Sequence, residues 1–457
     1  MSSNLCCHFL IILLLVLAIF VQLGTSRSKV EVLPGFEGPL PFELETGYVG
    51  LGERDDDMQV FYYFLKSEND SQKDPLMLWL SGGPGCSSLS GLLCQIASAA
   101  ATYSASTVDC VTVACFFDAQ ENIPDPSEKW LIDHPEFLLN EFYIGGDSYS
   151  GIPVPGIVQE ISNGNEIGLQ PQINLQGYLL GNPVTTGKEN NYQISFAHGM
   201  GLISDELYAS LQRNCKGEYI DIDSRNELCL RDMNYFEECL SEIDMGNILE
   251  HCCKVDLPKK HEAPWRRYLY QKFEASLNSY YTREPNLCCN IFSDFISAQW
   301  ANDESVRKSL HTREGTIGKW ERCYKTDFKF QISSSFDIHV NLSAKGYRSL
   351  IYSGDHDAVV PFISTQAWIR ALNYSIVEDW RPWLIEDHAS ESDLYSYTCM
   401  CWSKWENRGS PEAYGTMSLT QNLSALRKYR MILYWYIVYG TSLMLEKEMH
   451  LRQSHFT

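Results

Sequence analysis

The sequence predicts an α/β fold, because three apolar strands each end in a loop rich in glycine, serine or aspartate. Residues 141–144 have the composition of a buried strand, residues 145–151 break it, and residues 152–161 then have the apolar spacing of a helix. Two further apolar runs, 75–80 and 347–352, also stop at small or acidic residues. Such strand ends meet at one edge of an open α/β sheet, which is where ligands bind.

Further strands extend the predicted sheet. Residues 47–51 and 59–64 alternate in polarity and indicate an antiparallel pair, and residues 173–180 form a strand that Gly181-Asn182-Pro183 stops. Residues 195–310 are helical in pattern and rich in cysteine, which favours an insertion over the core sheet.

Two stretches show no recognisable rhythm of strand, loop and helix, namely residues 94–126 and the chain beyond about residue 387. We therefore predict one domain over residues 27–457, with a helical insertion at about 195–310 and a divergent tail from about 388. A chain of 457 residues with 44% hydrophobic content can bury a sizeable core as one domain with insertions.

The overall charge bears on partners. A formal net charge of −22 argues against a nucleic-acid partner, since such proteins need clustered Lys and Arg to displace counterions from phosphates. The apolar run at 431–445 is too short for a membrane span, so we also expect no stable span.

The N-terminus predicts secretion. Residues 9–23 are apolar and lead into Gly24-Thr25-Ser26, which has the length and exit residues of a signal peptide covering residues 1–26. No Lys or Arg precedes the run, and an N-terminal anchor is the alternative.

Two other features agree with a secretory, extracellular or vacuolar location. The glycosylation acceptor pattern occurs at Asn69, Asn341, Asn373 and Asn422. Sixteen cysteines, of which Cys6 and Cys7 lie in the predicted signal peptide, fit an oxidising compartment.

A metal site is the competing interpretation of some cysteines. Cys252-Cys253 and Cys288-Cys289 lie near histidines, but adjacent pairs lack the two-residue gap that lets one loop direct two thiolates at zinc. We therefore expect no metal.

Ser148 is the candidate nucleophile. It lies in Gly145-Gly146-Asp147-Ser148-Tyr149-Ser150-Gly151, and a serine on a tight strand-to-helix turn is how acyl-transfer enzymes expose such a group. A serine also needs a base, a carboxylate that orients the base, and donors for the oxyanion. Asp357, downstream at another strand end, supplies the carboxylate, and the amides of Gly83 and Tyr149 are the candidate donors.

Together these motifs resemble the serine carboxypeptidase family. The resemblance rests on Trp-Leu-Ser-Gly-Gly-Pro-Gly-Cys-Ser-Ser at 79–88, on the serine turn, and on the loop 355–361. Residues 33–50 and 347–383 look like the plant serine carboxypeptidase-like branch in particular. The resemblance implies an α/β-hydrolase fold with a mixed sheet and a helical, Cys-rich insertion, with Ser148 as nucleophile and Asp357 as triad acid.

The resemblance also implies disulfides and substrate contacts. Cys86 would pair with Cys323 and Cys215 with Cys229, and a third bridge would join the 252–253 and 288–289 pairs with its partners left open.

Ser81, Gly82 and Asp147 are the expected substrate-binding residues. Peptidases of the family usually carry Asn at the first of these positions and Glu at the last. The aspartate resembles the branch that takes acyl groups from glucose esters, so acyl transfer stays open beside hydrolysis.

The base is missing from the pattern. The family's Gly-Gly-His-Thr-like loop does not follow Asp357, and its Glu-Asn-Gly-Pro segment is absent between residues 94 and 126, which predicts the loss of a core strand. His388 is the nearest downstream histidine, yet it stands where the family has a noncatalytic residue. His356 adjoins Asp357 and would point to the opposite side, and His450 and His455 lie in a charged tail.

Three hypotheses follow: a serine carboxypeptidase-like hydrolase acting through an acyl-serine, a glucose-ester-dependent acyltransferase of the same fold, and a noncatalytic or mis-spliced product that lacks the triad histidine. The first two imply a peptide or small-molecule acyl ester as substrate and no cofactor.

Overall fold

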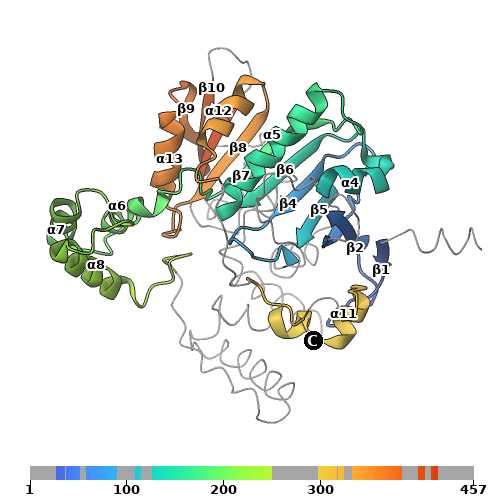
Figure 1. Cartoon of the computed structure of the whole chain (residues 1–457), viewed down its shortest axis with the longest axis horizontal. Coiled ribbons are helices and arrows are strands. Elements are labelled where there is room, and N and C mark those ends of the chain that lie inside the picture. The colour runs from blue at the N-terminus through green and yellow to red at the C-terminus, as the bar shows by residue number, and fades with distance from the viewer. Residues whose placement is uncertain are drawn as a thin grey trace, which may run out of the picture.

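The computed structural model describes residues 27–36, 38–51, 58–89, 109–114, 126–249, 297–315, 318–323, 332–382, 400–406 and 413–419 (Figure 1). The predicted signal peptide, Asn422, the cysteine pairs at 252–253 and 288–289, and the histidines at 388, 450 and 455 lie outside these ranges. Within the ranges, no helix combines the length and the hydropathy that crossing a bilayer requires.

An 11-stranded mixed sheet forms the centre, in the order β1-β2-β3-β5-β4-β6-β7-β8-β11-β10-β9. Neighbours from β5 through β4, β6, β7 and β8 to β11 run parallel, and the strands at both ends of the sheet are antiparallel. The strands are β1 (Arg27–Val30), β2 (Leu44–Leu51), β3 (Met58–Leu65), β4 (Leu76–Leu80), β5 (Asp109–Ala114), β6 (Phe142–Asp147), β7 (Leu175–Gly181), β8 (Arg348–Gly354), β9 (Ser375–Pro382), β10 (Met400–Glu406) and β11 (Ala413–Leu419).

The described helices follow the strands in the alternation that parallel sheets need. They are α4 (Pro126–Asp133), α5 (Pro153–Glu166), α6 (Gln193–Gly199), α7 (Asp205–Cys215), α8 (Glu227–Leu240), α11 (Glu304–Ser309), α12 (Phe336–Ala344) and α13 (Phe362–Ala371), with 3₁₀ turns η2 (Pro135–Phe137), η3 (Ser148–Gly151) and η4 (Glu189–Tyr192).

Two apolar clusters cover the two faces of the sheet, because successive side chains of a strand point to opposite faces. On β4, Leu78 belongs to one cluster and Trp79 to the other. The first cluster also includes buried side chains of α4, α5, α12 and α13, and the second includes Val306 of α11. A sheet covered on both faces explains why the central strands are continuously apolar.

One sequence-based expectation about the sheet is wrong. The missing pattern between residues 94 and 126 predicted the loss of a core strand, but β5 lies in this stretch and pairs antiparallel with β3 and parallel with β4. The sheet is therefore continuous up to the strand that leads to Ser148. Strands β10 and β11 likewise lie in the part of the sequence where we recognised no pattern, and β11 pairs parallel with β8.

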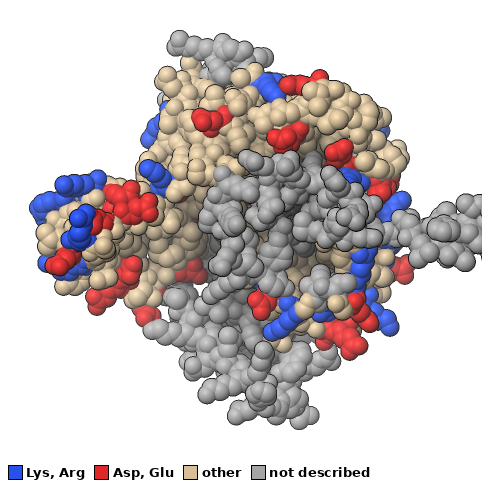
Figure 2. All heavy atoms as spheres, in the orientation of Figure 1, with Lys and Arg blue, Asp and Glu red and all other residues tan. Residues whose placement is uncertain are grey.

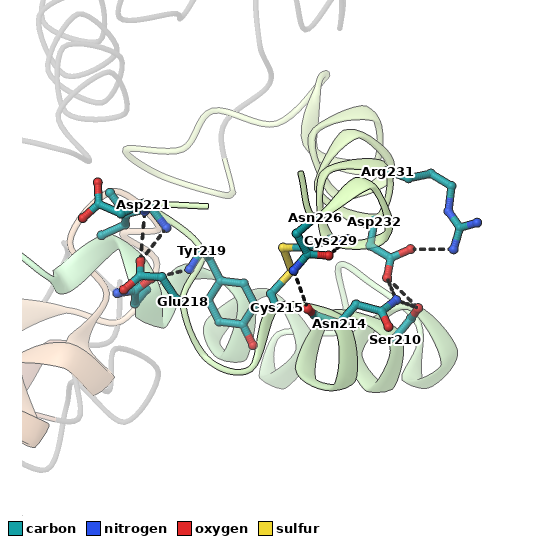
Figure 3. Close-up of a disulfide and its surroundings, with 12 residues drawn as sticks. Ser210, Asn214, Cys215, Glu218, Tyr219, Asp221, Asn226, Cys229, Arg231 and Asp232 are labelled. Atoms are coloured by element: carbon teal, nitrogen blue, oxygen red, sulfur yellow. Dashed lines mark hydrogen bonds and ion pairs between the residues drawn. A yellow bond between two sulfur atoms is a disulfide. The ribbon is translucent and has the colours of Figure 1, made fainter. Parts of the chain in front are cut away.

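Helices α7 and α8 project from the sheet, at the left of Figure 1. Together with α6 they enclose a small apolar cluster, and the disulfide Cys215–Cys229 joins α7 to α8 (Figure 3). The buried carboxylate of Asp232 accepts hydrogen bonds from Ser210 and Asn214 of the facing helix. Lys, Arg, Asp and Glu side chains are interspersed on the outer surface of this projection (Figure 2).

Candidate active site

Ser148 lies at a sharp turn between β6 and η3, with α5 directly after it. Its φ of 57° is in the left-handed region, which a residue with a Cβ adopts only when the surroundings enforce it. Val184 contributes to this restraint by donating its N–H to the Ser148 carbonyl at 2.9 Å. The succession of strand, strained serine and helix matches the backbone geometry of a nucleophile elbow.

Glycines allow the turn to pack closely. A Cβ on Gly146 would lie 2.6 Å from the Ser150 Cβ and 2.7 Å from the Leu80 carbonyl, and one on Gly151 would lie 2.3 Å from the Val184 carbonyl. Such contacts are too short for any side chain, so these positions admit only glycine. The turn is also hydrogen-bonded to β4, since the buried Ser150 hydroxyl donates to the Leu80 carbonyl at 3.0 Å.

The loop after β4 lies directly against the serine turn. A Cβ on Gly82 would come within 2.6 Å of the Ser148 Cβ and 2.9 Å of the Tyr149 amide nitrogen. Gly83 follows with a φ of 124°, and the Ser81 amide is fixed by the Ser88 hydroxyl at 2.9 Å. Of the residues that the sequence predicted in this loop, Gly82 is therefore in direct contact with the serine turn.

A small cavity lies where the loop and the turn meet. Its lining consists of Leu80, Ser81, Gly82, Gly85, Ser88, Tyr149, Ser150 and Pro153. Residues of the glycine loop and of the serine turn, Tyr149 among them, thus border one space.

Asp147 immediately precedes Ser148, and the pKa of its carboxyl group is shifted. Burial raises its pKa to about 6, although the positive charge of Arg322 and the N–H of Gly82 act in the opposite direction. The carboxyl is therefore half protonated in mildly acidic solution.

Sequence reasoning missed Arg322 as part of this site. The disulfide Cys86–Cys323, one of the two pairs that the resemblance implied, holds the arginine's segment against the loop after β4. The Ser87 amide donates to the Arg322 carbonyl at 2.7 Å, and the Trp320 indole donates to the Ser87 hydroxyl at 3.1 Å. The only signal in the sequence was that Arg322 adjoins Cys323, because Cys323 and its partner Cys86 are 237 residues apart and no local pattern connects them.

Asp357 lies beyond the carboxyl end of β8, at the same edge of the sheet as Ser148. Its Oδ1 accepts the N–H groups of Val359 at 2.7 Å and Val360 at 3.2 Å. Burial, with smaller contributions from the charges of Asp147 and Asp244, raises the pKa of Asp357 to about 7 despite these bonds. Because the charge of Asp147 acts on the pKa of Asp357, the two carboxyl groups lie in the same region, beside the serine turn.

The segment that follows α8 holds the loop of Asp357 from outside. Ala358 donates its N–H to the Met245 carbonyl at 2.8 Å, and Ile248 donates to the His356 carbonyl at 3.0 Å. The helical projection is thereby attached on both sides of Asp357.

Four of the five histidines in the described part of the chain lie against other partners, and the fifth, His311, is exposed beyond α11. His134 lies 2.8 Å from Glu45, His198 lies 2.7 Å from Asp205, and His356 lies 2.8 Å from Asp355. His339 is buried beside Tyr178, and burial lowers its pKa to about 3. Within the described residues, no histidine is hydrogen-bonded to Ser148 or Asp357.

After β8, strand β11 also ends at the sheet edge that carries Ser148 and Asp357. Leu419, the last residue of β11, pairs with Gly354 of β8, so β11 ends beside the loop of Asp357. In the sequence, the first histidine after Leu419 is His450. Among the described residues, no group of three or more His, Cys, Asp or Glu side chains could hold a metal ion.

Comparison with known proteins places this geometry in a family. The sequence model described as serine carboxypeptidase matches residues 34–108 and 121–407. Serine carboxypeptidase-like 12 of Arabidopsis thaliana is 44% identical over 414 residues, covering 82% of this chain and 88% of the relative. Serine carboxypeptidase-like 19 of the same plant is 45% identical over 431 residues, covering 85% and 90%.

A solved structure supports the fold. The crystal structure of a prohormone-processing carboxypeptidase from Saccharomyces cerevisiae matches with a TM-score of 0.61 at 16% identity, covering 93% of this chain and 94% of that one. The fold is that of the α/β-hydrolases, as the sequence motifs predicted, and the chain belongs to the serine carboxypeptidase family.

Proposed function

We propose that this member of the serine carboxypeptidase family acts by forming an acyl-enzyme on Ser148 and that its substrate is the C-terminal bond of a peptide. The observation that carries the proposal is the turn itself, with Ser148 at a φ of 57° and packed against Gly82. A plain helix start would need neither the strained backbone nor the glycine contact.

The chemistry assigns a role to each neighbour. The Ser148 oxygen attacks the substrate carbonyl, and the N–H groups of Gly83 and Tyr149 stabilise the negative oxygen that forms. The bond to the leaving group breaks as that group takes up a proton, and water then attacks the acyl-serine to regenerate the enzyme. Asp357 would orient the base that carries these protons.

The weak step is proton transfer from Ser148. The described residues supply no imidazole at the hydroxyl, and the hydrogen bonds that they give to Asp357 come from backbone amides of its own loop. Removing the proton acceptor from a serine triad costs orders of magnitude in rate, so we expect slow acylation for this chain as written.

Acyl transfer from a glucose ester is the second candidate, and Asp147 and Ser81 favour it. With a pKa of about 6, the carboxyl of Asp147 can donate a hydrogen bond in mild acid and accept one near neutrality. It can therefore contact a peptide's terminal carboxylate or a sugar hydroxyl, and the identity of the second nucleophile decides the product.

We also propose passage through the secretory pathway to the vacuole or cell exterior, with N-glycosylation. Asn69, Asn341 and Asn373 are exposed, and glycan acceptors lie at the surface of secreted proteins.

The test uses the purified full-length chain and a fluorophosphonate label, with and without added imidazole. We expect slow labelling of Ser148 that imidazole accelerates at least tenfold, and no labelling of the Ser148→Ala variant. A blocked dipeptide and, separately, an acyl glucose with an alcohol acceptor then separate hydrolysis from transfer by their products. Absence of labelling under every condition would refute the acyl-enzyme and leave the noncatalytic hypothesis.

A further inference from the structure

Asn182 follows β7 and lies between the two loops of the candidate site. The sequence alone marked Gly181-Asn182-Pro183 as nothing more than the end of a strand. In the structure Asn182 has a φ of 41°, and its N–H donates to the Tyr352 carbonyl of β8 at 2.8 Å. Asparagine tolerates this left-handed conformation better than other residues with a Cβ, apart from aspartate.

The side chain of Asn182 spans the loop that carries Asp357. Its Nδ2 donates to the Ser353 hydroxyl and to the Val360 carbonyl, both at 3.1 Å. Its Oδ1 accepts the Gly354 N–H at 3.1 Å. One amide therefore ties the residues that precede Asp357 to those that follow it, using both of its N–H donors and its acceptor.

The residues after Asn182 contact the serine turn. The N–H of Val184 donates to the Ser148 carbonyl at 2.9 Å. A Cβ on Gly151 would lie 2.6 Å from the Pro183 Cβ, so the turn and residues 183–184 are packed without a gap. Residues 182–184 thus connect the turn of Ser148 to the loop of Asp357.

We propose that Asn182 is a positioning residue that fixes the loop of Asp357 relative to Ser148. This inference rests on the proposed function, in which those two side chains act together. Asparagine suits the position because glycine keeps the backbone conformation but loses all three side-chain bonds, whereas aspartate keeps the acceptor and loses both N–H donors.

The experiment measures how Asp357 titrates, so it requires no turnover. Because the pKa of Asp357 is raised to about 7, its carboxyl group is ionised at pH 8 at the cost of stability and is protonated in the folded protein at pH 4. Asp357→Asn should therefore raise the thermal midpoint Tm at pH 8 but not at pH 4. In an Asn182→Gly background the loop opens to water and the pKa of Asp357 falls toward its ordinary value. We expect the gain in Tm from Asp357→Asn at pH 8 to shrink to half or less.

Asn165→Ala is the matched control. Asn165 also makes two side-chain bonds to the main chain, at 2.8 and 3.1 Å to Ile173, but at the opposite edge of the sheet. The control should lower Tm and leave the gain from Asp357→Asn unchanged. If Asn182→Gly behaves like this control, the residue is merely structural and the proposal is overturned.

Ser353→Ala keeps the test decisive if Asn182→Gly does not fold. It removes one partner of the Asn182 amide and should reduce the same gain by a smaller amount. An unchanged gain in that variant would contradict the proposal. Failure here leaves the labelling of Ser148 unaffected, so the two proposals fail separately.

Discussion

Gly82 illustrates how a single missing side chain shapes the site. The two nearest backbone atoms to its would-be Cβ are the Asp147 carbonyl oxygen at 2.7 Å and the Tyr149 nitrogen at 2.9 Å. Because backbone atoms cannot rotate away as a flexible side chain can, any substitution must displace the serine turn or the loop after β4.

We predict that Gly82→Ala destabilises the protein by about 1–3 kcal/mol, the usual cost of overpacking a close contact. Gly156→Ala is the matched control, since nothing lies within 4 Å of its would-be Cβ in helix α5. That change should stabilise by about 0.5–1 kcal/mol, because alanine favours helix over glycine. Urea unfolding of the two variants checks both signs, and equal effects would show that the contact at Gly82 does not constrain the turn.

At the scale of elements, the projection of α7 and α8 depends on few interactions. Its apolar cluster is separate from the clusters that cover the sheet, and the Cys215–Cys229 disulfide and the buried Asp232 network join the two helices. Small units with little core of their own rely on such cross-links.

Replacing Cys215 and Cys229 together by serine should destabilise the projection by about 3 kcal/mol, since the bridge closes a short loop. Limited proteolysis should then cut between α7 and α8 at least tenfold faster than in the parent, while the sheet resists. Equal cleavage rates in the two proteins would mean that packing alone holds the helices together.

For the whole molecule, two carboxyl groups of the candidate site lower stability as the pH rises, and buried His339, whose pKa is lowered to about 3, offsets part of this effect below about pH 6.5. The folded-state pKa values of about 6 for Asp147 and about 7 for Asp357 lie above the ordinary value near 4. Between about pH 4 and pH 7 the folded protein holds protons that the unfolded chain has lost, so its stability falls as the pH rises.

Glu45 has the opposite effect in stronger acid. Burial alone raises its pKa, but hydrogen bonds from His134 and Tyr62 outweigh this and lower it. A carboxyl with a lowered pKa contributes stability above the pKa of the unfolded chain and loses it as the pH falls through the folded value.

We therefore predict a higher Tm at pH 5 than at pH 8, and a decline again in strong acid. The double variant Asp147→Asn with Asp357→Asn should have a higher Tm at pH 8 and a flatter dependence of Tm on pH between pH 5 and pH 8. Scanning calorimetry across this range measures both effects. A Tm that rises steadily from pH 5 to pH 8 in the parent would contradict the assigned pKa shifts.

The sequence by itself determined the features that depend on neighbouring residues. The apolar strand, the glycines and the serine at 141–151 predict the tight turn, because backbone sterics and side-chain periodicity act over a few residues. The same holds for β4 with its glycine loop and for β8 with Asp357, and these motifs sufficed to identify the family.

Only the tertiary structure decided how distant segments meet. Strand β5 completes the sheet although its stretch of sequence showed no pattern, since pairing with β3 and β4 supplies hydrogen bonds that local propensity does not encode. Arg322 approaches Asp147, and Asn182 joins two loops, because chain crossings bring together residues that are far apart in sequence. Such contacts depend on the packing of the whole sheet, which no local pattern records.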